Sequence, residues 1–388
     1  AFNPYNEQFG DKVAFIASDR PYMGVTGDRT EFIGRNGSIS SPLALKREGL
    51  SNRVGAGFDP CGVIQVNVSL EPGQQEEIIF ILGQGNNEEQ AREIIRDYAN
   101  ADAARQALEA SKNIWEDRLN AVEVRTPDES MNIMLNRWLI YQTLSSRILA
   151  RTGFYQAGGA YGFRDQLQDV LALIYSDPNL MKEQILLSSE HQFTQGDVQH
   201  WWHPPNRGVR TRITDDLLFL PYVTANYIEG TGDWSILEEK THYLVDEPLE
   251  EDEVDRYNIP GVSEDKESIY DHCTRAIEKS LSFGQHGLPL MGGGDWNDGM
   301  DKVGIQGRGE SVWLGWFLYT VLDKFIPICK QRNDEERAEK YQEAAENLKK
   351  AIDKNGWVGG WYRRAYFDDG TPLGSELTEE CRIDAISQ

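Results

Sequence analysis

Helical patterns dominate the chain from residue 126 to its end, and they constrain the fold more than any other feature of the sequence. In seven long segments, apolar residues recur every three or four positions, which places them on one face of a helix. We count about eight helices there, and no exact repeat period links them, which argues against a short-repeat solenoid. Helices that alternate with polar loops favour a helical toroid. The segments are residues 130–150, 164–176, 179–193, 215–232, 267–281, 310–326 and 334–355.

The first 86 residues have a different texture. Three segments rich in β-branched and aromatic residues, 11–18, 62–73 and 75–85, are separated by Gly, Pro and Asn-Gly and predict a partial β-sandwich. Apolar residues at helical spacing then predict two linker helices over residues 87–125. We therefore expect three parts: a strand part over 1–86, a helical linker over 87–125 and a large helical domain over 126–388.

The charge of the chain limits its partners. Its formal net charge is −24, from 63 acidic and 39 basic residues. This charge repels nucleic-acid backbones and anionic membrane surfaces, so we expect neither as a partner. A small anion stays possible, because two or three local arginines hold a phosphate whatever the total charge. The four cysteines form no CxxC pair, which argues against a zinc ribbon or a dithiol redox centre.

The two ends of the chain carry expectations about its context. The segment AFNPYNEQFG lacks the basic and apolar regions of a signal peptide, and no apolar run approaches the roughly 20 residues that cross a bilayer. We therefore expect a cytoplasmic protein in which residues 1–388 make no contact with a membrane. The last residues, CRIDAISQ, resemble the start of a helix. We therefore expect the chain to be a piece of a longer protein.

The most concentrated polar cluster is GGGDWNDGMD, residues 292–301. Asp295, Asp298 and Asp301 are three positions apart, and glycines give the preceding backbone shapes that are closed to other residues. Trp296 stands among them, and an indole excludes water from a neighbouring carboxyl group, raises its pKa and stacks on sugars. The pattern indicates an acid beside a sugar subsite. An ordinary turn or a calcium-type loop is the alternative, although the spacing lacks the oxygen pattern of an EF-hand.

The second cluster is GGAYGFRDQLQD, residues 158–169. Asp165 and Asp169 are four positions apart, so both project from one face of a helix that begins near Phe163, with Arg164 beside them. Like charges on one face cost stability unless hydrogen bonds or a ligand use them, and sugar hydroxyl groups do so. The alternative is a first helical turn enriched in Asp because the helix dipole favours it.

The third cluster is HQFTQGDVQHWWHPPNRGVRTRITDD, which we expect to be a loop. Trp201 and Trp202 are costly to expose without purpose, and indoles with guanidinium groups suit a carbohydrate ligand. Packing between loops is the alternative for both rings. His200 and His203 with Asp197 resemble a metal site only superficially, because their spacing matches neither a zincin nor a short zinc knuckle. We expect no metal.

Arg151 in ARTGFYQ and Glu310 in GRGESVWLGWF complete the candidate set. A guanidinium offers a bidentate fork to a phosphate, so Arg151 is a candidate phosphate ligand. A surface salt bridge is the equal alternative.

Four motifs in the same order, GGAYGFRDQLQD, VQHWWHPPNRGVRTRITDDLLFLPY, GGGDWNDGMD and GRGESVWLGWFL, resemble the glycoside phosphorylases of glycoside hydrolase family ninety-four. Within this family, the motif sequences are most similar to the branch that contains 1,2-β-oligoglucan phosphorylase and the C-terminal region of cyclic β-1,2-glucan synthase. The resemblance covers nearly the whole chain. It implies an N-terminal β-sandwich, a helical linker and a catalytic (α/α)6 toroid, incomplete here because a full toroid has about 12 helices.

The resemblance also implies an inverting reaction, in which inorganic phosphate attacks a β-linked gluco-oligosaccharide and releases α-glucose 1-phosphate and a shortened chain. The second Asp of the DWND motif falls on Asp298, the implied general acid, with Trp296 lining the sugar subsite. Arg164 and Asp169 would hold sugar hydroxyls, and Arg151 would reach the phosphate. Phosphate is a co-substrate, no cofactor is implied, and family members are often homodimers. Further candidates for substrate contacts are Asp165, Trp201, Trp202, Asp295 and Glu310.

An inverting hydrolase needs two carboxylates, one as acid and one as base, separated enough to admit a water. A phosphorylase needs one, because phosphate is already nucleophilic and a second carboxylate would repel it. One unmistakable acid loop therefore favours phosphorolysis. A hydrolase, or a non-catalytic carbohydrate-binding remnant of a larger glucan synthase, is the alternative.

Overall fold

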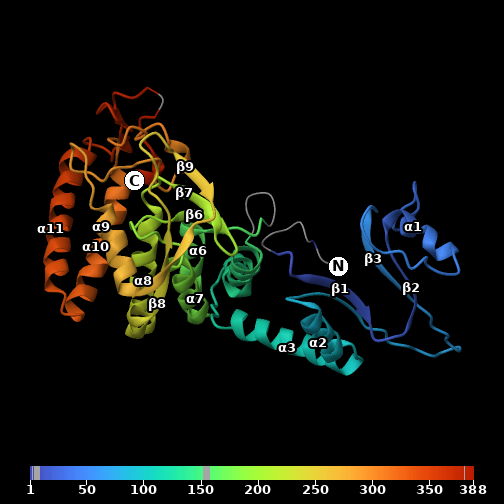
Figure 1. Cartoon of the computed structure of the whole chain (residues 1–388). Coiled ribbons are helices and arrows are strands. Elements are labelled where there is room, and N and C mark those ends of the chain that lie inside the picture. The colour runs from blue at the N-terminus through green and yellow to red at the C-terminus, as the bar shows by residue number, and fades with distance from the viewer. Residues whose placement is uncertain (2, 4–8, 152–157, 380) are drawn as a thin grey trace. The chain divides into compact units, whose positions relative to one another are not determined.

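The computed structural model describes residues 1, 3, 9–151, 158–379 and 381–388 (Figure 1). It divides the chain into two compact units, residues 1–117 and 118–388. The boundary falls inside a long helix, α3 (Ala101–Leu119).

Within the described part of the first unit, the strands form two separate two-stranded antiparallel sheets. The predicted strands at 11–18, 62–73 and 75–85 are confirmed as β1, β3 and β4, whereas β2 was not predicted because its sequence, YMGVTGD, holds two glycines. A short helix, α1 (Arg29–Ile33), follows β2. The paired strands are β1 (Val13–Ser18) with β4 (Phe80–Gly85), and β2 (Tyr22–Asp28) with β3 (Pro60–Val66).

Both predicted helices after the strands are present, α2 (Glu88–Tyr98) and α3. The Asn87 side chain accepts a hydrogen bond from the Gln90 amide and so caps α2. This helix packs against β1 and β4.

The second unit is built from helices that coincide with the seven predicted patterns. The first pattern is a helical run, α4 (Glu129–Ile133) and α5 (Leu139–Gln142) joined by π-type turns, with non-helical backbone at Asn136 and Arg137. Neighbours in the series pack side by side, α6 on α7, α7 on α8, and α10 on both α8 and α11 (Figure 1). The helices are α6 (Phe163–Val170), α7 (Pro178–Ser189), α8 (Phe219–Thr231), α9 (Ile269–Ser280), α10 (Val312–Gln331) and α11 (Glu335–Ala351).

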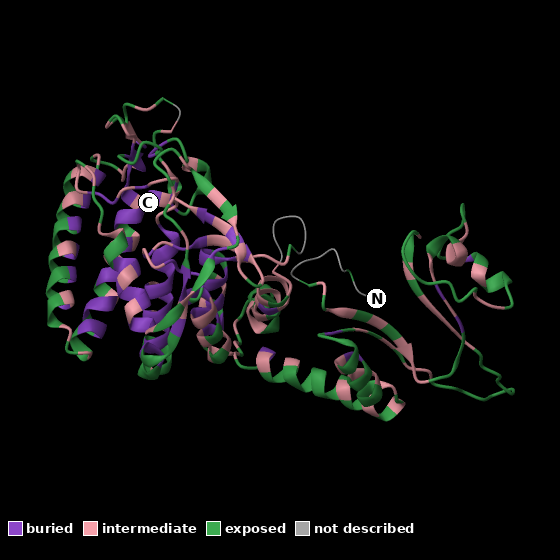
Figure 2. Ribbon diagram, viewed as in Figure 1, coloured by how far each residue is buried: buried purple, intermediate pink, exposed green. Residues whose placement is uncertain are grey.

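The core of this unit lies between these helices, where Figure 2 shows the buried residues gathered. Leu318, Leu322 and Phe325 of α10 are fully buried, as is Val223 of α8. By length and mean hydropathy, 20 residues and 1.3, α10 is the one helix among the described residues that would suffice to cross a membrane. It buries just over half of its apolar window and holds Pro327 inside, which fits the central helix of a packed bundle.

Short antiparallel sheets form the connections between the helices. The segment around Trp201 and Trp202, expected to be a loop, is instead a β-hairpin, in which Gln199–His203 pairs antiparallel with Arg207–Thr211. The four-stranded sheet has the order β5 (Tyr161–Gly162), β6 (Gln199–His203), β7 (Arg207–Thr211), β9 (Asp255–Asn258); β8 (Lys240–Val245) pairs with β10 (Gly261–Ser268); and β12 (Ala365–Tyr366) lies between β11 (Glu310–Ser311) and β13 (Pro372–Leu373).

Candidate active site

The acidic loop, residues 292–301, begins with glycines that lie against residues 212–214, which follow β7. The amide of Gly293 donates to the carbonyl of Arg212 at 2.9 Å, and the amide of Thr214 donates to the carbonyl of Gly294 at 3.1 Å. Gly292 has φ +61°, and a Cβ there would lie 2.1 Å from the Arg212 carbonyl oxygen. Only glycine fits this approach, which brings the acidic loop beside the residues that follow Thr214.

Asp298 presents a half-exposed carboxylate in this loop. It begins a short 3₁₀ turn, and 51% of its side chain is exposed. Its Oδ1 accepts a hydrogen bond from Nη2 of Arg164 at 2.7 Å, and its Oδ2 lies 3.6 Å from Nε2 of His200. Two basic side chains therefore hold the carboxylate while leaving half of it open to a ligand.

Arg164 reaches Asp298 from the first turn of α6. Its Nη1 donates to both carboxylate oxygens of Asp215, at 3.0 Å each, and to the main-chain carbonyl of Asp295 at 3.3 Å. The guanidinium is buried. The guanidinium of Arg164 thus joins three parts of the chain that are distant in the sequence: the start of α6, Asp215 and the acidic loop.

His200, in β6, is the second basic group at Asp298. Its Nδ1 lies 2.7 Å from Oδ2 of Asp216. Burial on its own would lower the pKa of His200, but the hydrogen bonds to Asp216 and Asp298 outweigh it and raise the pKa from its ordinary value of 6.5 to about 10. His200 is therefore an imidazolium at neutral pH, with both ring nitrogens as donors.

The carboxyl groups of the cluster respond in opposite directions. Burial of Asp298 opposes its ionisation, yet the hydrogen bonds from His200 and Arg164 prevail and lower its pKa. Burial raises the pKa of Asp215 well above its ordinary value, and the neighbouring Asp216 adds to this effect while Arg164 opposes it. In this arrangement Asp298 is a carboxylate, and any proton it donates must first be supplied to it.

Trp296 extends the site along α6. Its side chain is 44% exposed, and its Nε1 donates to Oε1 of Gln168 at 3.1 Å. The same helix therefore contacts the acidic loop twice, through Arg164 and through Gln168. The open indole offers a surface on which a sugar ring can stack.

Asp165 and Asp169 lie on α6 with Arg164, so the structure brings the first and second predicted clusters together. Asp165 is exposed. Asp169 accepts a hydrogen bond from Nε of Arg147 at 2.8 Å, and its burial raises its pKa although Arg147 opposes the shift.

Asp295 does not face a ligand, although the sequence predicts that it binds substrate. Its side chain is fully buried, and its two oxygens accept from Nη1 and Nη2 of Arg364 at 2.6 Å each. Ser311 Oγ donates to it at 2.7 Å. With its oxygens occupied, Asp295 fixes the acidic loop to the chain around residue 364, and it is a positioning residue.

Glu310 is likewise engaged inside the fold. It is buried and accepts from the amides of His286 and Leu288 at 3.0 and 3.1 Å, and it also pairs with the His286 ring. These bonds fix the turn at residues 286–288. We therefore assign Glu310 to the support of this turn and not to substrate contact.

The two predicted aromatic ligands have different positions. Trp202 is 1% exposed and lies between the His191 ring, at 3.8 Å between centroids, and the Tyr161 ring, at 5.4 Å. It therefore packs in the core, which is the alternative the sequence left open. Trp201 is partly exposed and contacts Tyr257 at 5.5 Å.

Arg151 is bound to Gly159 and Tyr161. Its Nε donates to the carbonyl of Gly159 at 3.0 Å and its Nη1 to Oη of Tyr161 at 3.1 Å, with the guanidinium over the Tyr161 ring. The structure thus places Arg151 beside β5, and its contact with a phosphate stays a prediction.

Comparison with known proteins assigns the family. The model of the glycosyl hydrolase 94 superfamily catalytic domain matches residues 114–388, and the model of the glycosyl hydrolase 94 supersandwich domain matches residues 1–101. The chain belongs to the glycosyl hydrolase 94 superfamily. Within its catalytic domain lie the acidic loop, α6 and the β6–β7 hairpin that build the site.

Relatives in this superfamily include synthases and phosphorylases. The chain is 44% identical to the cyclic beta-(1,2)-glucan synthase NdvB of Rhizobium meliloti (strain 1021) over 391 residues, which is 100% of this chain and 14% of that protein. It is 31% identical to the solabiose phosphorylase of Paenibacillus borealis over 96% of this chain and 45% of that protein. It is 26% identical to the N,N'-diacetylchitobiose phosphorylase of Vibrio proteolyticus, over 98% of this chain and 48% of that protein. The chain thus spans about half or less of these relatives.

Several residues of this glycosyl hydrolase 94 site escaped the sequence analysis. His200 drew notice only as a metal candidate, yet it pairs with Asp216, while Asp197 pairs with Arg210 at 2.6 Å and His203 lies 3.2 Å from the Gly158 carbonyl. The doublet Asp215–Asp216 at the end of the third motif was the available signal. For Arg364 and Gln168 the sequence offers no signal, because their partners are far away along the chain.

The Asp216 contact should control the charge of His200. Replacement Asp216→Asn is expected to bring the pKa of His200 down from about 10, because it removes the negative charge that opposes the burial effect and leaves at most a neutral hydrogen bond. The ring signals of ¹³C,¹⁵N-labelled histidine, followed by NMR between pH 6 and 10, measure this shift, and His200→Gln identifies the signal. A His200 that titrates near 6.5 in the unaltered chain would contradict the geometry.

Proposed function

We propose that the protein, at its native length, catalyses inverting phosphorolysis of β-linked gluco-oligosaccharides to α-glucose 1-phosphate and a shortened chain. One observation carries the proposal: the half-exposed Asp298 carboxylate, held by Arg164 and His200 and flanked by the open ring of Trp296. Asp298 is the general acid that protonates the leaving glycosidic oxygen. Trp296 supports the sugar ring, and Arg164 with Asp169 holds hydroxyl groups, with Asp165 as a further candidate.

The charges in the site couple the protonation of Asp298 to the binding of phosphate. Asp298 is a carboxylate while Arg164 and His200 hold it, since they lower its pKa. A phosphate dianion beside it is a like charge that raises the pKa of a carboxyl group and competes for the two basic groups. Asp298 therefore takes up its proton when the nucleophile arrives, and water can deliver that proton because half of the side chain is exposed.

The occupied carboxylates favour phosphorolysis over hydrolysis. Asp215 accepts hydrogen bonds from Arg164, and Asp295 accepts them from Arg364. Oδ2 of Asp216 is held by His200, and its Oδ1 is buried without a hydrogen-bond partner among the described residues. A carboxylate whose oxygens accept hydrogen bonds from a guanidinium is a poor base for a water. The alternative, a hydrolase on the same scaffold, needs an accessible carboxylate as its base, and the exposed Asp165 is a candidate.

The 44% identity to a cyclic beta-(1,2)-glucan synthase over the whole chain supports a β-1,2-linked glucan as the substrate. The packing of α6 to α11 in series supports an (α/α)6 toroid as the architecture of the catalytic domain. A cytoplasmic location suits the reaction, because its charged sugar-phosphate product is retained inside a membrane. A homodimer stays part of the proposal.

Withdrawal of phosphate should stop the reaction. With β-1,2-gluco-oligosaccharides, the protein at its native length is expected to release glucose 1-phosphate only when phosphate is present, and the product should be the α anomer, because a single displacement inverts the anomeric carbon. Proton NMR of the anomeric signal measures both. β-1,4-gluco-oligosaccharides are the control for linkage.

Two further measurements distinguish phosphorolysis from hydrolysis. Arsenate should replace phosphate and yield free glucose, because its sugar ester hydrolyses in water. Release of reducing sugar at a comparable rate without either anion would contradict phosphorolysis and favour the hydrolase.

A further inference from the structure

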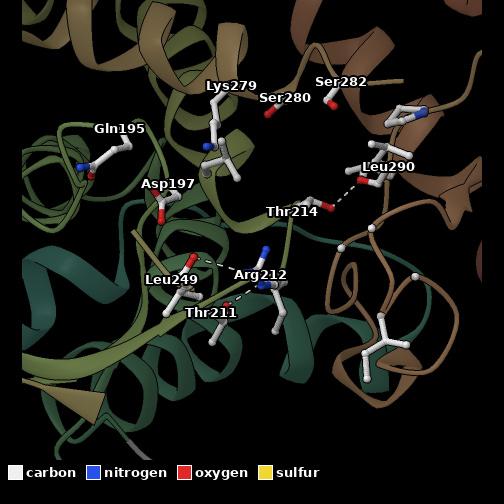
Figure 3. Close-up of a pocket in the computed structure, with 18 of the residues that line it drawn as sticks. Gln195, Asp197, Thr211, Arg212, Thr214, Leu249, Lys279, Ser280, Ser282 and Leu290 are labelled. Carbon is white, nitrogen blue, oxygen red and sulfur yellow. Dashed lines mark hydrogen bonds between the residues drawn. The ribbon is translucent and has the colours of Figure 1, made fainter. Parts of the chain in front are cut away.

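A second concave site lies in the catalytic domain, away from Asp298. It is a cavity of about 780 Å³, within the size range of small-molecule sites (Figure 3). The end of α9 contributes Lys279, Ser280 and the nearby Ser282 on one side, and the segment with Arg212 and Thr214, which follows β7, lies opposite.

The cavity and the acidic loop share a wall. Arg212 and Thr214 line the cavity, and Asp215 and Asp216 of the acid cluster follow them directly. Thr214 also donates its hydroxyl hydrogen bond to the carbonyls of Leu290 and Met291, just before the glycines of the loop. Asp298, Trp296 and Arg164 do not line the cavity. A ligand there would therefore occupy a different place from a sugar on Trp296.

The lining of the cavity is basic in a strongly acidic chain. Four of its residues are Arg or Lys and two are acidic, in a chain of net charge −24. Arg210 and Asp197 neutralise each other at 2.6 Å. Within the described ranges, no carboxylate forms an ion pair with the remaining three, Arg212, Lys279 and Arg308.

The hydrogen bonds of these basic groups leave donors available. Arg212 uses Nε and Nη2 on the carbonyls of Glu253 and Leu249, at 2.9 and 3.4 Å, and on that of Glu250, and its Nη1 has no partner among the residues the structure describes. Arg308 donates to the carbonyl of Asp368 at 3.1 Å and to Gln306. Lys279 is exposed at the end of its helix. Three cations with free donors match a doubly charged anion.

The other residues that line the cavity suit a ligand that carries a sugar as well as an anionic group. Ser280, Ser282 and Gln306 offer hydroxyl and amide groups, and the half-buried Leu249 and the exposed Ile305 supply apolar surface. Hydroxyl and amide groups pair with sugar hydroxyls, and apolar side chains cover the C–H face of a sugar ring. The cavity is also much larger than a phosphate ion alone requires.

We propose that this cavity is a binding site for a phosphorylated monosaccharide, with the phosphate between Arg212, Lys279 and Arg308 and the sugar toward Ser280, Ser282 and the apolar side chains of Leu249 and Ile305. The site is separate from the acid site, and it does not depend on phosphorolysis being the reaction.

Calorimetric titration of this chain with glucose 6-phosphate, inorganic phosphate and glucose tests the proposal. We expect saturable binding of glucose 6-phosphate, weaker binding of phosphate and weaker binding still of glucose. Double replacement Lys279→Gln/Arg308→Gln should weaken glucose 6-phosphate at least about tenfold, because two charge-assisted contacts are lost. Both side chains are exposed, so the fold should persist, and thermal unfolding checks this. Lys349→Gln, at the end of α11, is the matched control and should change the affinity less than about twofold.

Amide hydrogen exchange locates the ligand independently. Exchange at residues 279–282 and 304–308 should slow when glucose 6-phosphate is added, and the double variant should abolish the change. The proposal is overturned by an absence of saturable binding, by binding that survives the double variant, by an equal loss in Lys349→Gln, or by phosphate binding as tightly as glucose 6-phosphate. None of these measurements needs turnover, so each result stands apart from the phosphorolysis test.

Discussion

Asp298→Asn, in the protein at its native length, is expected to lower turnover on a β-linked gluco-oligosaccharide by about a hundredfold to ten-thousandfold, the usual contribution of a positioned general acid. Asparagine keeps the shape of the side chain and can accept from Arg164, so the fold and the sugar subsite should survive. Initial rates of phosphorolysis at saturating phosphate, with thermal unfolding as a check on folding, measure the effect.

The leaving group provides the decisive comparison for Asp298. An aryl glucoside with a strongly acidic phenol needs little protonation, so Asp298→Asn should lose much less on it than on the oligosaccharide. Asp301→Asn is the matched control, because Asp301 is an exposed carboxylate of the same loop, and its rate should stay close to that of the unaltered protein. A near-normal rate of Asp298→Asn on the oligosaccharide would refute the assignment.

Arg364→Ala should destabilise the catalytic domain more than any other single substitution considered. It leaves the fully buried Asp295 carboxylate without its guanidinium, and removal of one partner of a buried pair typically costs about 3–5 kcal/mol. Urea unfolding of this chain, followed by far-ultraviolet circular dichroism, measures the loss in the free energy of unfolding.

Arg125→Ala is the control for loss of an arginine. Its ion pair with Glu123 is exposed, so the urea midpoint should hardly move. Arg364→Lys should recover part of the stability, because it restores the charge without the bidentate fork. A midpoint for Arg364→Ala equal to that of Arg125→Ala would show that the buried pair contributes nothing.

The helices could be predicted because their cause is local. Apolar spacing within segments such as 312–331 and 335–351 fixes which face is buried, and Asp and Ser residues cap the starts. The β6–β7 hairpin was misjudged as a loop for the opposite reason. Its strands are held by partners in β5 and β9, which lie up to about fifty residues away, and no local period reveals such pairing.

The site shows the same division. The motifs identified Asp298, Arg164 and Trp296, and the structure brings them together, because family motifs mark residues that meet. The motifs did not distinguish a residue that meets a ligand from one that holds the loop. Asp295 and Glu310 look like ligand carboxylates in the sequence, yet their partners Arg364 and His286 lie 69 and 24 positions away. The burial of these two carboxylates depends on distant partners, and so the sequence could not show it.

The pairing of Asp295 with Arg364 also bears on how the protein is made. A ribosome completes the whole acidic loop long before it adds Arg364, which comes 69 residues after Asp295. Until then the nascent chain carries the acid motif with a carboxylate whose counter-ion does not yet exist, and water must solvate it. The loop can reach its final fixed position only after residue 364 has left the ribosome, so the arrival of Arg364 determines when the acid site is assembled.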